Sequence, residues 1–311
     1  MLLGLCVGIV AWLPIPHYLV QLPGPPIPTR DQVWVDDYER PADPGEFFIT
    51  TVYQRPATAW WWLRALIQPD WAIERQPPTP TSLHALSHGE EENHELLRQV
   101  VYHTCGIELL PAVHVLDLTP KSPLRGLAEP GDQLVSIQGV RVREIRQVRY
   151  LLQAHEQNAS LEIELKSPEQ PIRRYTIRPL QGDKGPSLGT FLSSRWDDSH
   201  LPRIFFKSGS YQGNSSNLSL ALDLCERLLR VNLRQGRKIA ATGGLAADGS
   251  ITAVQGLRQK FFSAARADAQ VFLIPAEGTE SAPADPALKG MKVVRVRSLG
   301  EAISWLRQGH N

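Results

Sequence analysis

Residues 213–222 read GNSSNLSLAL, a glycine-containing turn that runs straight into an apolar helix. Apolar residues recur at helical spacing as far as Val231, which predicts one buried face for this helix. Beyond it, short strands at 238–245, 251–254 and 270–274 alternate with a helix at 259–268. This alternation predicts an α/β domain, which we place at residues 190–311.

Two polar residues of this region can carry chemistry. Ser215 lies where the turn enters the helix, beside backbone amides that can stabilise an oxyanion. Lys260 opens an apolar helix, a setting that favours a neutral amine. Such an amine can take the proton of a serine hydroxyl, so that the oxygen attacks a carbonyl and forms an acyl-enzyme. Taken alone, the pattern favours a simpler alternative, in which Ser215 is a helix N-cap and Lys260 is solvated.

Four motifs of this region resemble, in order, those of Lon-type serine-lysine peptidase domains. They are Gly213–Leu222 (G-P-S-A-G-L-x-x-A-L in the family), Lys238–Leu245 with Asp248-Gly249 (K-I-A-G-T-G-x-I-x-x-D-G), Gln255–Lys260 with Ala264-Ala265 (G-G-I-x-Q-K-x-x-A-A) and Ala269–Pro275 (A-x-V-F-x-x-P). The resemblance implies that Ser215 is the nucleophile and Lys260 the general base. It further implies that Thr242 orients the pair, and it places Gly213 and Ser216 in supporting positions.

The chain departs from the family pattern beside the expected nucleophile and before the threonine. Asn214 and Asn217 replace a proline and a glycine beside the nucleophile, and Ala241 replaces the glycine before the threonine. Asparagine tolerates N-cap and left-handed backbone conformations, so we expect the turn to persist. A Cβ atom at position 217 narrows the space expected for the oxyanion. We expect an active serine endopeptidase, and the alternative is an inactive relic that serves as an adaptor or scaffold.

The middle of the chain, residues 108–182, predicts a small β-sandwich with one long helix at 144–155. Ser122-Pro123-Leu124 and Gly131–Val140 resemble the S-P-A…G-D-x-I-x-x-x-[DN]-G motif of PDZ domains. Such domains bind an extended peptide as an added strand beside a groove strand and a helix. The expected groove strand is about 113–118. The residues expected in the peptide groove are Val113, His114, Val115 and Leu116.

The segment before this strand differs from the PDZ pattern. Leu109–Ala112 contains no glycine loop, and Pro111 has no amide hydrogen, which argues against capture of a C-terminal carboxylate. A domain used only for spacing, or for packing on its neighbour, is the alternative to peptide binding.

The N-terminal segment is apolar. Residues 1–29 contain no charged side chain, and a spanning helix needs about 20 apolar residues, although Pro14 and Pro16 interrupt the run. We expect residues 1–22 to form an uncleaved membrane anchor. A cleaved signal peptide or a buried helix would be the alternatives.

Residues 23–107 predict a linker followed by a strand and helices that pack on the PDZ-like domain. Residues 21–44 hold six prolines, 46–53 are aromatic and β-branched, and 59–67 and 87–102 have helical patterns. Within this segment, Trp60–Trp62 belong either to a core or to an interfacial belt at a membrane.

The front half resembles a subgroup of membrane-anchored proteins that combine PDZ and Lon-like domains. The stretches that carry this resemblance are Leu13–Tyr18, Pro23–Pro25, Gly45–Val52 and Arg55–Thr58. It implies a single-pass bacterial membrane protein whose bulk lies outside the cytoplasmic membrane. It also implies independence from ATP, with unfolded or extended proteins as substrates. A homo-oligomeric ring used as a scaffold is a further alternative.

Composition and motif content argue against several classes of function. Lys and Arg number 33 and Asp and Glu 32, so there is no basic field for nucleic acid. Cys6, Cys105 and Cys225 form no C-x-x-C, and no glycine motif for phosphates or dinucleotides is present. His84, His88 and His94 lack a third ligand at a fixed spacing, so we expect surface histidines. We therefore expect no cofactor, no metal and no nucleic-acid partner.

Overall fold

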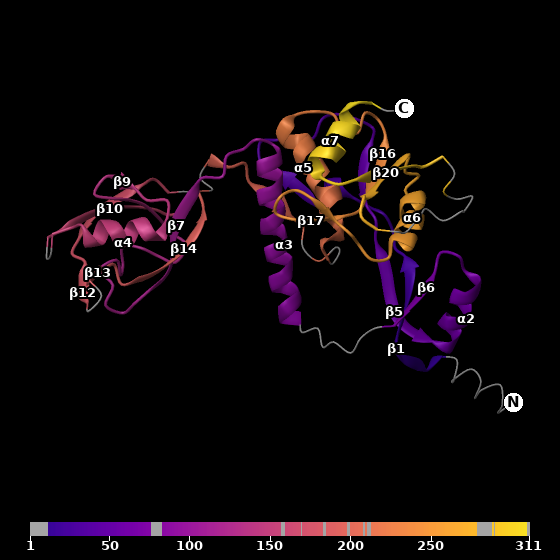
Figure 1. The fold of residues 1–311 in the computed structure, drawn as a ribbon, viewed down its shortest axis with the longest axis horizontal. Helices are drawn as coiled ribbons and strands as arrows, with labels where there is room; N and C mark the ends of the chain where they lie inside the picture. The colour runs from indigo at the N-terminus through magenta and orange to yellow at the C-terminus, as the bar shows by residue number, and fades with distance from the viewer. Residues whose placement is uncertain are drawn as a thin grey trace. The chain divides into compact units, whose positions relative to one another are not determined.

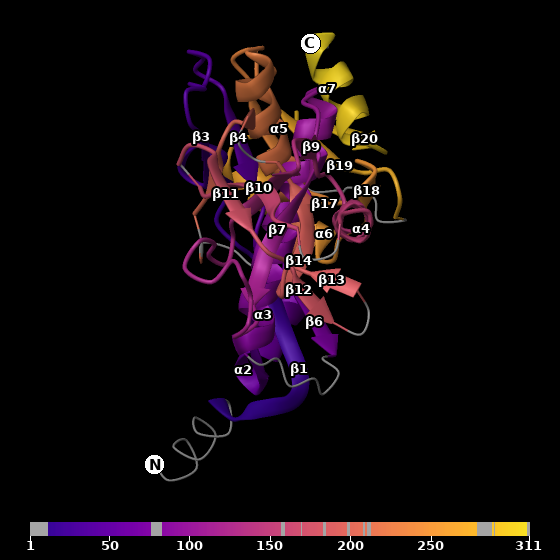
Figure 2. The ribbon, with the colours of Figure 1, turned by 90° about the vertical axis from the view of Figure 1, so that its left-hand side faces the viewer.

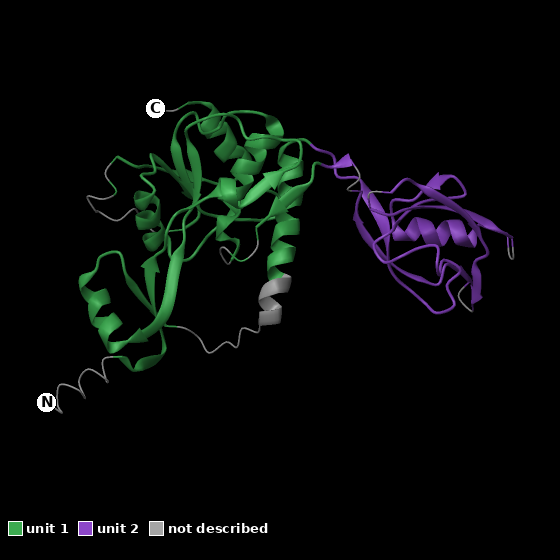
Figure 3. Cartoon of the chain, turned by 180° about the vertical axis from the view of Figure 1, so that it is seen from behind, with its two compact units in different colours: residues 1–106, 202–311 green, residues 107–201 purple. Residues whose placement is uncertain are grey.

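The chain forms two compact units (Figure 3). The computed structural model describes residues 12–75, 83–156, 159–168, 170–182, 185–197, 200–207, 209, 213–278, 288 and 290–309, with backbone alone for 83–88. Unit 1 comprises Met1–Gly106 and Pro202–Asn311, and unit 2 comprises Ile107–Leu201. Unit 2 is therefore an insertion in the chain of unit 1. The mixed α/β class expected from the sequence is confirmed.

A five-stranded sheet forms the centre of unit 1 (Figure 1). Its strands, in spatial order, are β2 (Ile27–Pro28), β4 (Glu46–Ile49), β16 (Lys238–Ala241), β19 (Val271–Pro275) and β20 (Lys292–Val296). All neighbours pair in parallel except β2, which is antiparallel to β4. The helices of unit 1 that accompany this sheet are α3 (Leu83–Thr104), α5 (Asn217–Leu229), α6 (Leu257–Arg266) and α7 (Leu299–Arg307). The strands of a parallel sheet are apolar throughout because helices cover both faces, and β19 (VFLIP) is buried at every position.

Short elements complete the centre of unit 1. They are the 3-10 helices η1 (Thr29–Asp31) and η3 (Asn214–Ser216), the pair β3 (Val33–Val35) and β15 (Ile204–Phe206), and the pair β17 (Gly244–Leu245) and β18 (Ile251–Thr252).

The position of β4 corrects the expected domain division. We expected residues 23–107 to pack on the PDZ-like domain, but Glu46–Ile49 pair in parallel with Lys238–Ala241, so this expectation is wrong. The apolar side chains of β4 suit a sheet that is covered on both faces, with Phe47 and Ile49 buried. The N-terminal segment is therefore a structural part of unit 1.

The N-terminal strand β1 (Pro14–Pro23) pairs with β5 (Val52–Thr58) and β6 (Ala72–Arg75). Together with α2 (Ala59–Ile67), these strands form what we call the aromatic lobe, residues 12–23 and 52–75, at one end of unit 1 (Figures 1 and 2).

The expected membrane anchor at 1–22 is wrong for residues 14–22, which lie in β1, while residues 1–11 lie outside the described residues. A physical reason is that Pro14 and Pro16 disrupt a helix interior but are tolerated in an edge or irregular strand. Among the described residues, no helix has both the length and the apolar character needed to cross a membrane.

Unit 2 is a β-sheet domain with one helix. Its main sheet has the order β11 (Arg173–Ile177), β10 (Leu161–Lys166), β8 (Gln133–Ile137), β7 (Pro111–Leu118) and β14 (Thr190–Trp196), with β9 (Val140–Arg141) paired to β8. The helix is α4 (Ile145–Gln153), and β12 (Leu180–Gly182) and β13 (Gly185–Ser187) form a hairpin. The expected boundary at 182 comes too early, because β14 pairs along the length of β7. We had assigned residues 190–196 to the C-terminal domain, and the structure places them in unit 2.

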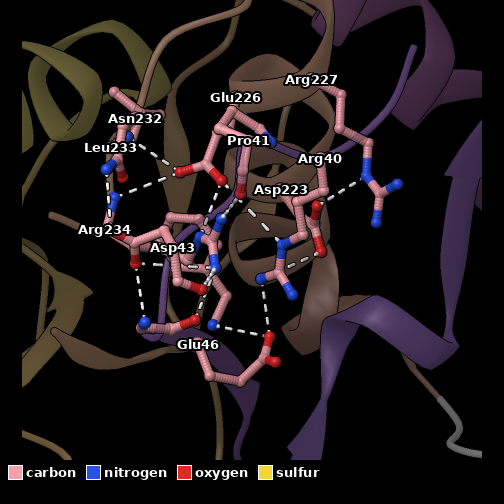
Figure 4. A network of polar contacts seen from close by, with 12 residues as sticks. Arg40, Pro41, Asp43, Glu46, Asp223, Glu226, Arg227, Asn232, Leu233 and Arg234 are labelled. Carbon is pink, nitrogen blue, oxygen red and sulfur yellow. Dashed lines mark hydrogen bonds and ion pairs between the residues drawn. The ribbon is translucent and has the colours of Figure 1, made fainter. Parts of the chain in front are cut away.

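A network of buried ion pairs connects the N-terminal segment to α5 (Figure 4). Glu46, Asp223 and Glu226 are at most 3% exposed, and Arg234 is 1% exposed. Arg40 binds Glu46 at 2.6 Å, and Arg227 binds Asp223 at 2.8 Å. Each carboxylate thus meets at least one guanidinium group, as burial of a charge requires.

Arg234 is the most enclosed cation of this network. Its Nε donates to Glu226 Oε1 at 2.7 Å, and its terminal nitrogens donate to the carbonyl oxygens of Gly45 (2.5 Å) and Pro41 (2.8 Å). Glu226 Oε2 accepts the amides of Leu233 and Arg234. Burial raises the pKa of the Glu226 carboxyl, and the nearby Arg234 opposes that shift. One guanidinium group therefore joins the segment before β4 to the end of α5.

We predict that Arg234→Met destabilises unit 1 by about 3–5 kcal/mol, because it leaves Glu226 buried without its cation. Urea unfolding followed by circular dichroism measures this change. Lys238→Ala is the matched control: its partner Asp268 is 85% exposed, so we expect a loss below about 1 kcal/mol. Equal losses in the two variants would contradict a stabilising role for the buried network.

Candidate active site

The turn that carries Ser215 is held by the strand that follows α5 in the chain. Gly213 has φ of 90°, a conformation that suits glycine, and leads into η3, which is followed by α5. The carbonyl of Ser215 accepts the amide of Gly243 at 2.9 Å, and Leu218 donates its amide to the carbonyl of Gly243 at 3.1 Å. The serine is therefore fixed at the N-terminal end of α5 by backbone contacts with the segment after β16.

Thr242 connects the two candidate catalytic residues. Its hydroxyl donates to the carbonyl oxygen of Ser215 at 3.1 Å, and Lys260 Nζ donates to the same hydroxyl at 3.2 Å. Thr242 is fully buried, Lys260 is 4% exposed, and Ser215 is partly exposed. The fold thus brings together Ser215, Thr242 and Lys260 from three separate motifs, with the serine nearest to solvent.

Lys260 reaches this position from the first turns of α6. Gly256 begins that helix with φ of 66°, and the amide of Lys260 bonds to the carbonyl of Gly256 at 3.1 Å. The same helix buries Phe261, which packs edge-on against Phe272 of β19 at 5.1 Å between ring centroids. Lys260 thus lies in a helix that is largely buried, and its amine contacts the Thr242 hydroxyl.

The glycines after Thr242 allow close packing beside the serine turn. A Cβ atom on Gly243 would lie 2.6 Å from Ile251 Cγ2. One on Gly244 would overlap the Thr252 hydroxyl and lie 3.0 Å from the Asn214 amide nitrogen. Contacts this short exclude a side chain, which explains why the threonine is followed by two glycines.

Asn217, which replaces a family glycine, makes a specific contact. Its side-chain amide and that of Asn93 on α3 exchange two hydrogen bonds, at 2.8 and 3.1 Å. Asn217 is fully buried. We expected the Cβ atom at position 217 to narrow the space for the oxyanion. The structure shows that the polar end of the Asn217 side chain is directed toward α3. Sequence reasoning missed Asn93, because a single polar residue in a helix carries no signal of its partner.

The remaining expected site residues have structural contacts. Ser216 is 2% exposed, and its hydroxyl donates to the carbonyl of Gly213 at 3.4 Å, within the turn. His94 stacks on Phe206 with ring centroids 4.2 Å apart, and burial lowers its pKa, so it is not the surface histidine that we expected. The side chains of His84 and His88 lie outside the described residues. No group of three potential metal ligands occurs among the residues whose side chains are described.

The expected peptide groove on β7 is wrong. β7 pairs with β8 on one side and β14 on the other, so it has no free edge for an added strand. Val113 and Val115 belong to the core of unit 2, whereas Leu116 is exposed. His114 lies in the same inner strand. Within the described part of the sheet, β14 is the terminal strand beside β7.

The free edge of β14 can be assigned residue by residue. The amide of Val115 donates to Asp132 on the β8 side at 2.8 Å, and the amide of Asp197 donates to Leu110 on the β7 side at 2.7 Å. Because hydrogen-bonding direction alternates along a strand, the backbone of Ser193 and Arg195 faces β7 and that of Ser194 faces the open edge. Gly189, with φ of 62°, immediately precedes this strand. A glycine loop is thus present before β14 rather than before β7.

Comparisons with known proteins find one matching family model and similar solved structures. Residues 205–306 match the family model of the Lon protease (S16) C-terminal proteolytic domain, which supports a serine-type peptidase. The PDZ domain of the SdrC-like protein of Listeria innocua is similar at 19% identity and a TM-score of 0.24, over 26% of this chain and 92% of that one. The corresponding domain from Listeria monocytogenes is similar at 18% identity and a TM-score of 0.24, over 26% and 85%. No curated protein matches the chain.

We predict that Thr242→Val lowers kcat for protein cleavage by about tenfold to a hundredfold with little change in KM, because Lys260 loses the hydroxyl that positions it. Thr242→Ser keeps a hydroxyl and is expected to restore most of the rate. Initial rates on fluorescently labelled casein measure both parameters. A wild-type kcat for the valine variant would show that Thr242 does not position the lysine.

Proposed function

We propose that the chain is a membrane-attached, ATP-independent serine endopeptidase that uses Ser215 and Lys260 as a dyad. The observation that carries this proposal is the hydroxyl of Thr242, which contacts both the Ser215 carbonyl and the Lys260 amine inside the region that matches the Lon proteolytic domain. Attachment to the cytoplasmic membrane, with the bulk of the chain outside it, rests on the resemblance of the front half to membrane-anchored PDZ and Lon-like proteins.

The geometry supports a mechanism of acyl transfer. Burial favours a neutral Lys260, which takes the proton of the Ser215 hydroxyl while the serine oxygen bonds to the substrate carbonyl carbon. Amides at the N-terminal end of α5 lie beside Ser215, where they can stabilise the oxyanion. The Lys260 ammonium then gives its proton to the leaving amine as the peptide bond breaks. Water hydrolyses the serine ester in a second step.

Extended polypeptide is the substrate class that this proposal implies. Ser215 lies on a partly exposed turn, and unit 2 offers an open strand edge at β14. An extended segment can add to such an edge through backbone hydrogen bonds, which folded proteins rarely have available. Unit 2 then serves as the binding module of the endopeptidase.

We predict that the full chain in mild detergent degrades casein, and that Ser215→Ala and Lys260→Ala each lower the rate to below about one thousandth, because the dyad acts as one unit. The rate is measured at pH 7 to 9 by release of labelled fragments. Lys238→Ala, which changes an exposed lysine of the same unit, is expected to keep the wild-type rate. If all four proteins are folded and equally inert, the chain is an adaptor rather than a peptidase.

We further predict that Ser194→Pro weakens binding of fluorescein-labelled casein by about tenfold, since it removes an amide that faces the open edge of β14. Ser194→Ala is the matched control and is expected to bind normally, because the hydroxyl is not needed for strand addition. Both changes are made in the Ser215→Ala chain, so that the probe is not cleaved, and fluorescence anisotropy gives the affinity. Equal affinities would exclude β14 as the peptide site.

A further inference from the structure

The helix α2 exposes an unusual amount of apolar surface. Its sequence, AWWWLRALI, has one charged residue in nine, and none of the nine is buried. Its exposed large apolar side chains are Trp60, Leu63, Leu66 and Ile67, which are 45%, 63%, 68% and 77% exposed. Of the two alternatives for Trp60–Trp62, a core does not fit, because none of the three is buried. A contiguous apolar surface of this kind marks an interaction site.

Two further exposed apolar side chains of the aromatic lobe lie just before β1. Trp12 and Leu13 are 61% and 56% exposed, and the Trp12 ring packs edge-on against Trp61 of α2 at 6.4 Å. The eleven residues that precede Trp12 contain no charged side chain in the sequence. The chain thus enters the aromatic lobe from a segment without charged side chains, next to Trp61 of α2.

The composition of the aromatic lobe is that of a membrane interface. Five of the eight tryptophans of the chain lie in it, at positions 12, 60, 61, 62 and 71. Exposed arginines lie over two of their rings: Arg55 is 4.1 Å from the Trp61 centroid and Arg64 is 5.6 Å from that of Trp71. Tryptophan and arginine side chains are enriched at the level of lipid headgroups, because each combines an apolar body with a polar group.

We propose that the aromatic lobe rests in the interfacial layer of a phospholipid bilayer, with Leu63, Leu66 and Ile67 of α2 inserted among the lipid chains. This inference rests on the membrane attachment in the proposed function and adds a second, peripheral contact to it. A short amphipathic or apolar helix binds in this way in proportion to the apolar area that it buries.

Binding of the aromatic lobe in this layer sets the distance between Lys260 and the bilayer. Arg266, at the end of α6, donates to the carbonyl of Pro23 at 2.6 Å, and Arg258 donates to the carbonyl of Pro69 at 2.9 Å. The helix that carries Lys260 is thus joined to both ends of the lobe. The implied substrates are extended segments close to the membrane surface.

Tryptophan quenching by brominated lipids tests this inference. The full chain is reconstituted in phosphatidylcholine–phosphatidylglycerol vesicles, with and without brominated phosphatidylcholine, and flotation records attachment separately. We expect brominated vesicles to quench the wild-type emission. The triple change Leu63→Glu, Leu66→Glu and Ile67→Glu is expected to float but to lose most of the quenching, because the introduced charges keep α2 out of the lipid chains.

A matched variant controls for added charge. Val140→Glu with Ile172→Glu changes two apolar side chains of unit 2 that are 51% and 53% exposed, and quenching is expected to stay at the wild-type level. A wild-type chain that floats without being quenched, or a triple variant quenched like the wild type, would overturn this inference alone. Failure of the wild type to float would overturn it together with membrane attachment. Emission that depends on protein concentration without lipid would show that a second copy covers α2 instead.

Discussion

The parallel pairing of β4 with β16 is the interaction on which the rest of unit 1 depends. It inserts a strand from the N-terminal segment into the sheet that leads to Thr242, with Ile49 opposite Ala241. The hydroxyl of Ser219 on α5 joins the two strands, as it contacts the carbonyl oxygens of Ala241 at 2.7 Å and Phe48 at 3.2 Å. The helix α5, which begins just after Ser215, is therefore packed on a sheet built from segments near both ends of the chain.

The buried charges make this arrangement specific. An apolar strand such as β4 can pair with many exposed edges, and hydrophobic burial alone does not select its register. Glu46, at the start of β4, binds Arg40, and Arg234 binds the carbonyls of Asp43 and Gly45, just before the strand. Each of these charges would be left unsatisfied by a shifted strand, at a cost of several kcal/mol. We infer that the network selects one register and so one position for the turn that carries Ser215.

Unit 2 is inserted between two segments of the chain that both belong to unit 1. α3 approaches the site through the Asn93–Asn217 contact and ends at Thr104, just before the chain leaves unit 1 at residue 107. The chain returns at residue 202, where the hydroxyl of Tyr102 on α3 donates to the carbonyl of Pro202 at 2.5 Å. Both connections to unit 2 thus leave from one place on unit 1. A domain inserted in this manner can vary its surface without changes in the central sheet of unit 1.

Local patterns in the sequence determined much of what the structure contains. The helix at 59–67 matches its predicted bounds, and those at 144–155 and 259–268 lie within about two residues of theirs. These bounds depend on residues close together in the chain, where periodicity and glycine positions are informative. That Ser215, Thr242 and Lys260 belong together was implied by the resemblance to Lon-type domains. Tertiary structure alone decided that residues 14–23 form a strand, that β4 joins the central sheet of unit 1, and that β14 rather than β7 is the open edge. Each of these depends on which distant segment supplies the hydrogen bonds of a strand, and the backbone groups that make those bonds are the same in every residue except proline.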